Sequence, residues 1–283
     1  PSPSKDTLRK RGTTSMAAKK KKAKKVPLKK KKNISTHSIP AANPILHVRV
    51  SRFNPQMDFN ARTHEYSIAP KEGESVLDLL TRLKHVQDGS LTFRGSCGYG
   101  GCGSCGVKAN GKPVLGCVTQ VKDVVDEHHS LRVDPLNEKN VIKDLVTDEK
   151  PFFDELLRVK PWIVSRAHDE RRNHKMGVKD VVKLGNAQQC ILCGLCNANA
   201  DSSSRAEIGP AAFVKAYRYA NDLRDGDVKR LSTLSTHFPP HYSLDKANLC
   251  PRNIAPGDKL KEMRGIQKAQ DAKQSNGKHE KNE

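Results

Sequence analysis

Alternating hydrophobic and polar positions indicate strands in the first part of the chain. Residues 47–52, HVRVSR, alternate in this way, and residues 64–68, HEYSI, do the same. The segment between them contains a turn-prone Asn-Pro pair, so the two runs predict a β-hairpin. Within residues 107–115, the pair Asn110-Gly111 predicts a second hairpin with a two-residue turn.

A helix is predicted after the first hairpin. Residues 75–86, SVLDLLTRLKHV, begin with a serine and place Val76, Leu79, Leu80 and Leu83 on one helical face. A glycine-rich loop with three cysteines follows. Two strands, a helix and a cysteine loop, in this order, are typical of a small β-grasp ferredoxin domain.

From about residue 140 the pattern becomes helical. Helix-like segments separated by Gly, Pro and Ser occur at residues 141–145, 152–159, 178–184, 210–223 and 258–263. We find no convincing strand pattern among them. We therefore expect an α+β protein, with a β-grasp domain at residues 41–139, an all-α domain at 140–264 and a polar tail at 265–283.

Residues 1–40 form a separate basic arm. They hold fourteen Lys and Arg residues against one acid, Asp6, which gives a net charge of +13 out of the total of +20. The arm has no aromatic residue and few large apolar ones, so it cannot build a core, and we expect a polyanion to order it. The candidate nucleic-acid contacts are its lysine blocks: Lys19, Lys20, Lys21, Lys22, Lys24, Lys25, Lys29, Lys30, Lys31 and Lys32.

Other interpretations of the arm stay open. A solubilising or targeting extension has a similar composition, although a mitochondrial presequence favours Arg and Ser, whereas blocks of Lys dominate here. No stretch of the sequence reaches the roughly 20 apolar residues of a transmembrane helix. The net charge of +13 and the lysine blocks of the arm favour RNA as its partner over these alternatives.

The eight cysteines fall into two sets. Cys97, Cys102, Cys105 and Cys117 follow a C-x4-C-x2-C-x11-C spacing, which is the plant-type pattern of 2Fe-2S ligands. The glycines between them permit positive φ and let backbone N–H groups point at cluster sulfurs. A disulfide framework needs an oxidising compartment, and a zinc site favours two separated C-x2-C pairs. The first set is therefore predicted to hold a 2Fe-2S cluster.

The second set has the pattern of a cubane cluster. Cys190, Cys193 and Cys196 form a C-x2-C-x2-C run, and Cys250, which is followed by proline, supplies a remote fourth thiol. Zinc has no need for three cysteines crowded at one helix start. We predict a 4Fe-4S cluster, and no cysteine is left for a third metal centre.

Residues 47–263 resemble the iron–sulfur subunit of succinate dehydrogenase and fumarate reductase. The resemblance covers about three quarters of the chain and runs through LTFRGSCGYGGCGSC, NGKPVLGC, NVIKDLVTD, QCILCGLC, IGPAAFVKAYR, DLRD and CPRNIAPG. It implies a 2Fe-2S β-grasp domain followed by an α-helical ferredoxin domain. In that family, electrons leave a flavin, pass through 2Fe-2S and 4Fe-4S clusters, and reach quinone by way of a 3Fe-4S cluster.

The chain departs from the family at the third cluster. The positions that match its three cysteine ligands are Ala200, Pro240 and Lys246. The family's quinone pocket also uses a Pro and a Trp pair after the cysteine run, whereas Trp162 is the only Trp here and lies elsewhere. His241 matches a family histidine beside the quinone, but without the pocket and the cluster a role in packing or hydrogen bonding is favoured for it. We expect no 3Fe-4S cluster and no quinone reduction.

Two functions from different classes follow, and in neither is the chain a catalyst by itself. In the first, the clusters cross-link distant segments of the chain and so stabilise it as a structural subunit of a large RNA-containing assembly. The expected host is the mitochondrial ribosome in the matrix. In the second, the chain passes electrons from a flavoprotein to a non-quinone acceptor in a divergent respiratory or reductase complex, which can lie at the matrix face of the inner membrane. Gly98 and Tyr99 replace a charged pair of the family, which alters the expected flavoprotein contact. A nucleic-acid-binding redox sensor is a third interpretation.

Overall fold

The computed structural model describes residues 45–164, 176–200, 208–227, 229–230, 234, 236–237, 244 and 248–279. The chain divides into two units, residues 1–39 and 40–283, and every described residue belongs to the second. The ten lysines predicted to contact nucleic acid lie outside the described residues. Pro240, His241 and Lys246 lie outside them as well.

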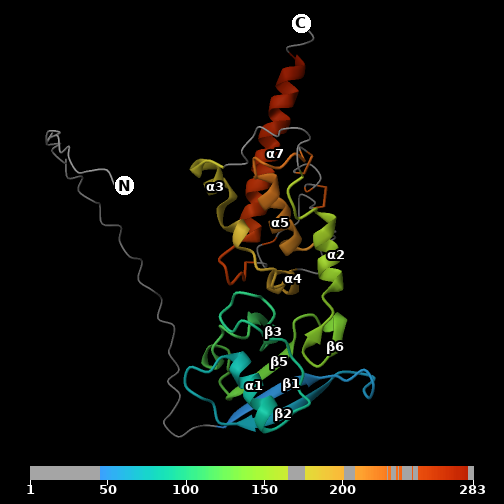
Figure 1. Cartoon of the computed structure of the whole chain (residues 1–283), viewed down its shortest axis with the longest axis vertical. Helices are drawn as coiled ribbons and strands as arrows, with labels where there is room; N and C mark the ends of the chain where they lie inside the picture. The colour runs from blue at the N-terminus through green and yellow to red at the C-terminus, as the bar shows by residue number, and fades with distance from the viewer. Residues whose placement is uncertain are drawn as a thin grey trace, which may run out of the picture. The chain divides into compact units, whose positions relative to one another are not determined.

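A five-stranded mixed sheet forms the first domain (Figure 1). Its strands are β1 (Leu46–Arg52), β2 (Arg62–Ile68), β3 (Gly106–Ala109), β4 (Lys112–Leu115) and β5 (Ser130–Pro135). Their order is β2-β1-β5-β3-β4, in which β1 and β5 are parallel and the other neighbours antiparallel. Both predicted hairpins are confirmed, and Asn110 and Gly111 turn between β3 and β4 at positive φ.

Helix α1 (Val76–Val86) begins with a capping box. Ser75 Oγ accepts a hydrogen bond from the Asp78 backbone N–H at 3.1 Å, and Asp78 Oδ2 accepts one from the Ser75 N–H at 3.2 Å. These bonds satisfy N–H groups that have no partner within the helix. The predicted apolar face is confirmed, because it is buried in a core that comprises Val76, Leu79, Leu80 and Leu83 of α1 with Leu46, Val48, Val50, Leu131 and Val133 of the sheet.

The segment 141–145, predicted as helical, is a strand and a turn. Strand β6 (Val141–Lys143) pairs antiparallel with β7 (Val146–Thr147) in a small second sheet. Asp144 turns between them with φ of 48°, and Leu145 is buried in the core of the first domain. The helix prediction is wrong because a five-residue segment with three apolar positions fits a strand as well as a helix, and tertiary pairing decided between them.

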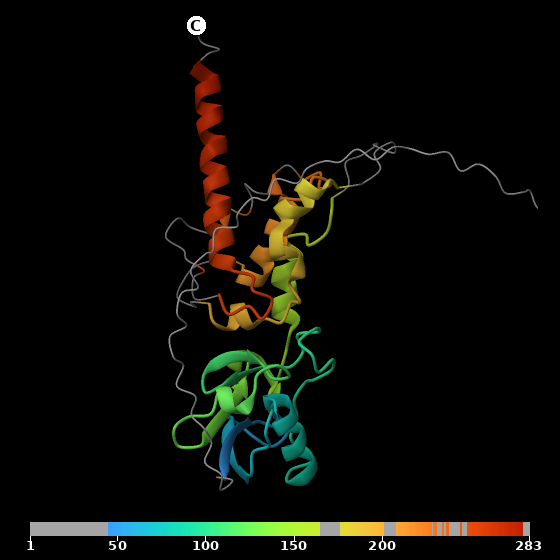
Figure 2. The same cartoon turned by 90° about the vertical axis from the view of Figure 1, so that its left-hand side faces the viewer.

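From Lys150 onward the described residues contain helices and turns but no strand (Figure 2). The helices are α2 (Lys150–Arg158), α3 (Val178–Leu184), α4 (Leu195–Ala198), α5 (Pro210–Ala220) and α7 (Pro256–His279). Short 3₁₀ turns occur at Val121–Asp123, Glu138–Asn140 and Gly185–Gln189. Phe213 and Tyr217 of α5 pack with Leu260 and Met263 of α7 in one buried core, so α5 holds the centre of this helical part.

Helix α7 is longer than the sequence predicts. A polar tail that follows the helical domain is expected from Gly265, whereas the chain is helical to His279. This stretch is rich in Lys, Gln and Ala, which have high helix propensity. Among the described helices, none combines the length and the apolar character needed to cross a lipid bilayer.

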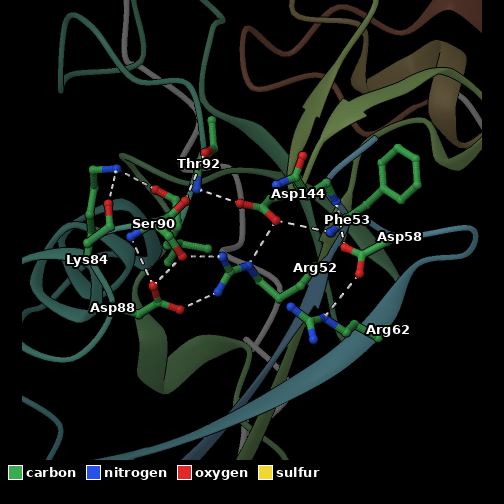
Figure 3. Close-up of polar contacts among 12 residues, drawn as sticks. Arg52, Phe53, Asp58, Arg62, Lys84, Asp88, Ser90, Thr92 and Asp144 are labelled. Atoms are coloured by element: carbon green, nitrogen blue, oxygen red, sulfur yellow. Dashed lines mark hydrogen bonds and ion pairs between the residues drawn. The ribbon is translucent and has the colours of Figure 1, made fainter. Parts of the chain in front are cut away.

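A buried arginine at the end of β1 joins distant parts of the first domain (Figure 3). Arg52 Nε donates to Asp144 Oδ1 at 2.9 Å, and Nη1 donates to Tyr66 Oη at 2.6 Å and also to Asp88. Nη2 donates to Ser90 Oγ at 2.8 Å. Arg52 is 7% exposed and Asp144 2% exposed, so the ion pair between them is shielded from water. The contacts of Arg52 connect β1 and β2 to the loop after α1 and to the β6–β7 turn.

We expect Asp88 to make this domain less stable in acid. Burial alone would raise the Asp88 pKa, but hydrogen bonds from Ser90, Tyr66 and Arg52 outweigh it and hold the pKa well below the ordinary 3.8. A depressed carboxylate pKa stabilises the fold at neutral pH, and that stability is lost as the pH falls below about 4 toward the folded-state pKa. Urea unfolding of wild type and Asp88→Asn at neutral and acid pH measures the loss. An equal pH dependence in the two proteins would contradict this role.

Candidate metal centres

The first cysteine set lies in the loop between α1 and β3 and just after β4. Gly98, Gly100 and Gly103 adopt φ of 74°, 74° and 78°, a region that favours glycine. This curvature aims backbone N–H groups at sulfur. The donors and acceptors are Gly100 N to Cys117 Sγ at 3.2 Å, Gly101 N to Cys97 Sγ at 3.2 Å, Cys102 N to Cys97 Sγ at 3.3 Å and Cys117 N to Cys105 Sγ at 3.4 Å.

Two cysteines of this loop, Cys102 and Cys105, differ in exposure and in the pKa of their thiols. Cys102 is exposed, and its contact with Ser104 Oγ at 3.2 Å, together with hydrogen bonds involving Cys97, lowers the Cys102 pKa to about 6. Cys105 is buried, and burial raises its pKa to about 11. A thiolate is the form that ligates iron, so Cys102 is ready to bind while Cys105 must lose a proton on binding.

The second cysteine set surrounds the start of α4. Gly194 turns the chain there with φ of 74°, and Leu192 has φ of 57°. Burial raises the pKa of the Cys196 thiol most strongly, and Cys190, Cys193 and Cys250 raise it further, so the four sulfurs lie within electrostatic reach of one another. The backbone N–H of Arg252 donates a hydrogen bond to Cys250 Sγ at 3.4 Å.

The donor chemistry of both sets fits iron–sulfur clusters. Each set provides four cysteines, and the first loop adds several N–H···S contacts of the kind that tune and hold such clusters. Across the part of the chain that the structure describes, no three His, Cys, Asp or Glu side chains converge on a point suited to a single metal ion. Clusters of two or four irons space their ligands around several metal atoms.

The two cysteine sets meet in one small core. Cys105, Leu115 and Leu195 are buried there, and Cys117 and Cys193 pack against them. Gly103 allows the closest approach, because a Cβ on this residue would lie 2.9 Å from Cys193 Cβ, 3.0 Å from Cys193 Cα and 3.1 Å from Ile191 O. The loop of the first set therefore touches the backbone of the second.

We expect Gly103→Ala to force these loops apart. The new methyl group adds a clash with Cys193 to the strain of a left-handed backbone, and the protein should lose more stability than Gly111→Ala. Gly111 is the matched control, because it has φ of +76° with nothing within 4 Å of its Cβ position, so alanine there should cost only about 1–2 kcal/mol.

Urea unfolding of both variants compares these costs. If both sets hold clusters, the magnetic interaction between the reduced clusters, measured by electron paramagnetic resonance, should also weaken in Gly103→Ala alone. Equal losses of stability, with an unchanged magnetic interaction, would show that the two loops are not in close contact.

All eight predicted cysteines lie among the described residues. So does Ala200, which is half-buried and offers no donor side chain, whereas the two other positions matching third-cluster ligands are not described. The sequence indicates Gly103 as one of the glycines that permit positive φ, but it reveals neither the contact of Gly103 with Cys193 nor the role of Ser104. The C-G-S-C spacing contains both, but their contacts with Cys102 and Cys193 depend on the folded loop.

Comparisons with known proteins agree with the first site. Residues 47–154 match a family described as a 2Fe-2S iron-sulfur cluster binding domain. A chain of the Mycobacterium smegmatis Sdh1 complex, solved in the apo form, is similar at 27% identity with a TM-score of 0.69, over 80% of this chain and 96% of that one. A hypothetical protein from Helicobacter pylori shares the fold at 19% identity with a TM-score of 0.50, over 78% of this chain and 39% of that one. Residues 47–154 are thus similar to 2Fe-2S cluster binding domains, and the chain as a whole is similar to a subunit of the Sdh1 complex.

Proposed function

We propose that this chain is an electron-transfer subunit of a multi-subunit complex. It takes electrons from a flavoprotein at a 2Fe-2S cluster on Cys97, Cys102, Cys105 and Cys117, and releases them from a 4Fe-4S cluster on the second cysteine set to an acceptor other than quinone. The observation that carries this proposal is the contact of Gly103 with Cys193, which brings the two cysteine loops together. In a subunit whose clusters only cross-linked distant parts of the fold, the two clusters would not need to lie next to each other.

The residues of this chain would bind and orient the clusters and shield them from water. Iron–sulfur clusters, when bound, exchange single electrons, so the protein supplies ligands, hydrogen bonds and a controlled exposure to water. Cys102 is exposed and marks the open side of the first site, whereas Cys105 and Cys193 face the shared core. A partner that donates electrons would therefore approach the side of Cys102, and the contact between the loops would hold the two ligand sets next to each other.

The proposed acceptor differs from quinone because the chain lacks ligands for a third cluster. Ala200 is a half-buried alanine, and the other two positions carry Pro240 and Lys246. Alanine and proline side chains hold no atom that ligates iron. The succinate dehydrogenase family reaches quinone through its third cluster, so this route is interrupted.

Purification of the complex from its native source, under anaerobic conditions, tests the proposal. A flavin-containing subunit should copurify, and the reduced flavoprotein should bleach the absorbance of both centres in the chain. A native complex without flavin, or centres that only a strong artificial reductant can reduce, would contradict electron transfer.

The charge of residues 1–40 favours a second candidate. A net charge of +13 in a segment without aromatic residues suits contact with RNA phosphates, and in this case the chain is a structural subunit of an RNA-containing assembly in mitochondria, with the ribosome as the first host to examine. Deletion of residues 1–40 should then release the protein from an RNA-containing particle in sedimentation and leave its iron content unchanged. Replacing the ten lysines with arginine should preserve the association, while glutamine should abolish it. Unchanged sedimentation of the deletion variant would rule out this role for the arm.

A further inference from the structure

Lys215 reaches the second cysteine set from helix α5. Its Nζ donates a hydrogen bond to the backbone carbonyl oxygen of Cys190 at 3.0 Å, and the residue is half-buried. The residues around it on α5, including Phe213 and Ala216, are fully buried in the helical core. The ammonium group is therefore presented to Cys190 from a fixed element.

The charge of Lys215 lies beside a cysteine of the second set. Its Nζ bonds the main chain of Cys190 itself, so the positive charge is held next to this residue. A hydrogen bond to a carbonyl oxygen requires only a donor, and an amide would supply one. What the lysine adds is a positive charge beside a proposed iron ligand.

A second lysine in the helical part, Lys259, has its positive charge balanced by a carboxylate. Lys259 Nζ lies 3.1 Å from a carboxylate oxygen of Glu262, which balances its charge. Lys259 lies on α7, where it also contacts the ring of Tyr217 at 5.2 Å. It serves as a matched control for the effect of removing a lysine from this helical core.

We propose that Lys215 raises the reduction potential of the 4Fe-4S cluster held by Cys190, Cys193, Cys196 and Cys250. This inference rests on the proposed function. Reduction adds one electron, and so one negative charge, which comes from the flavoprotein in the complex and from dithionite in the test. A nearby positive charge in a half-buried site stabilises the reduced state more than the oxidised state. Lys215 is a positioning and tuning residue that acts through the field and does not ligate iron.

Three substitutions separate charge from hydrogen bonding in the full-length chain. Lys215→Arg keeps both, Lys215→Gln keeps a donor without the charge, and Lys215→Met removes both. Each protein is titrated with dithionite and redox mediators while electron paramagnetic resonance follows the reduced clusters. In the Gln and Met variants the equilibrium constant for one-electron reduction of the 4Fe-4S cluster should fall roughly tenfold, which is about 59 mV. The Arg variant, Lys259→Gln and the 2Fe-2S signal of every protein should keep the wild-type potential.

The outcomes are distinct. A Gln variant with the wild-type potential overturns the proposal, because the hydrogen bond would then explain the role of Lys215. A comparable shift in Lys259→Gln also overturns it, since the effect would not depend on the position of the charge. A wild-type protein that shows no 4Fe-4S signal overturns the proposed function together with this inference, whereas a signal with unshifted potentials overturns the tuning alone.

Discussion

Replacing Arg52 with methionine is expected to lower the free energy of unfolding by about 3–5 kcal/mol. Arg52 is the cation between Asp88 and Asp144, and Asp144 is almost completely buried. Methionine fills a similar space but leaves two carboxylates facing each other without a positive charge. Urea unfolding, followed by circular dichroism at neutral pH, measures the loss.

The control for this prediction is an exposed ion pair on the same sheet. Arg132 Nε lies 2.8 Å from Asp134 Oδ2, but the arginine side chain is 51% exposed, so solvent screens the pair. Arg132→Met should change stability by no more than about 1 kcal/mol. If the two methionine variants were equally stable, the buried network would not hold this domain together.

Replacing Cys250 with alanine is expected to remove the 4Fe-4S cluster and leave the 2Fe-2S cluster in place. Cys250 packs against the helical core and is separated from Cys196 by more than fifty residues, so the proposed cluster joins two distant segments. Metal binding of this kind contributes directly to folding, and the helical part should therefore unfold at lower temperature. Iron and sulfide analysis, with thermal unfolding, tests both effects.

Two further variants make the Cys250 experiment specific. Leu249→Ala changes the exposed neighbour of Cys250 and should keep both clusters. Cys102→Ala should have the reciprocal effect, with loss of the 2Fe-2S cluster and retention of the 4Fe-4S cluster. If Cys250→Ala kept its full iron content, Cys250 would not be a ligand.

The features that the sequence predicts well are local. The two hairpins follow from alternation and turn residues, and α1 follows from Ser75 and the spacing of its apolar residues. The spacing of Cys97, Cys102 and Cys105 is also local, and the match to a 2Fe-2S cluster binding domain covers this set. Such patterns need no knowledge of distant partners.

The features that the sequence could not predict depend on distant residues. Asp144 is 92 positions from Arg52, and nothing in either neighbourhood indicates their pairing. The same pairing holds the turn between β6 and β7, which is one reason why the helix predicted at residues 141–145 is not formed. Gly103 and Lys215 also gain their roles from residues in other elements, Cys193 and Cys190.

Electron paramagnetic resonance of the native full-length protein tests the two-cluster assignment most directly. After reduction with dithionite we expect two signals, one from a 2Fe-2S and one from a 4Fe-4S cluster, with about six irons per chain. In the oxidised protein we expect no 3Fe-4S signal. A 3Fe-4S signal in the oxidised protein, or a single 2Fe-2S signal with about two irons per chain, would contradict the assignment.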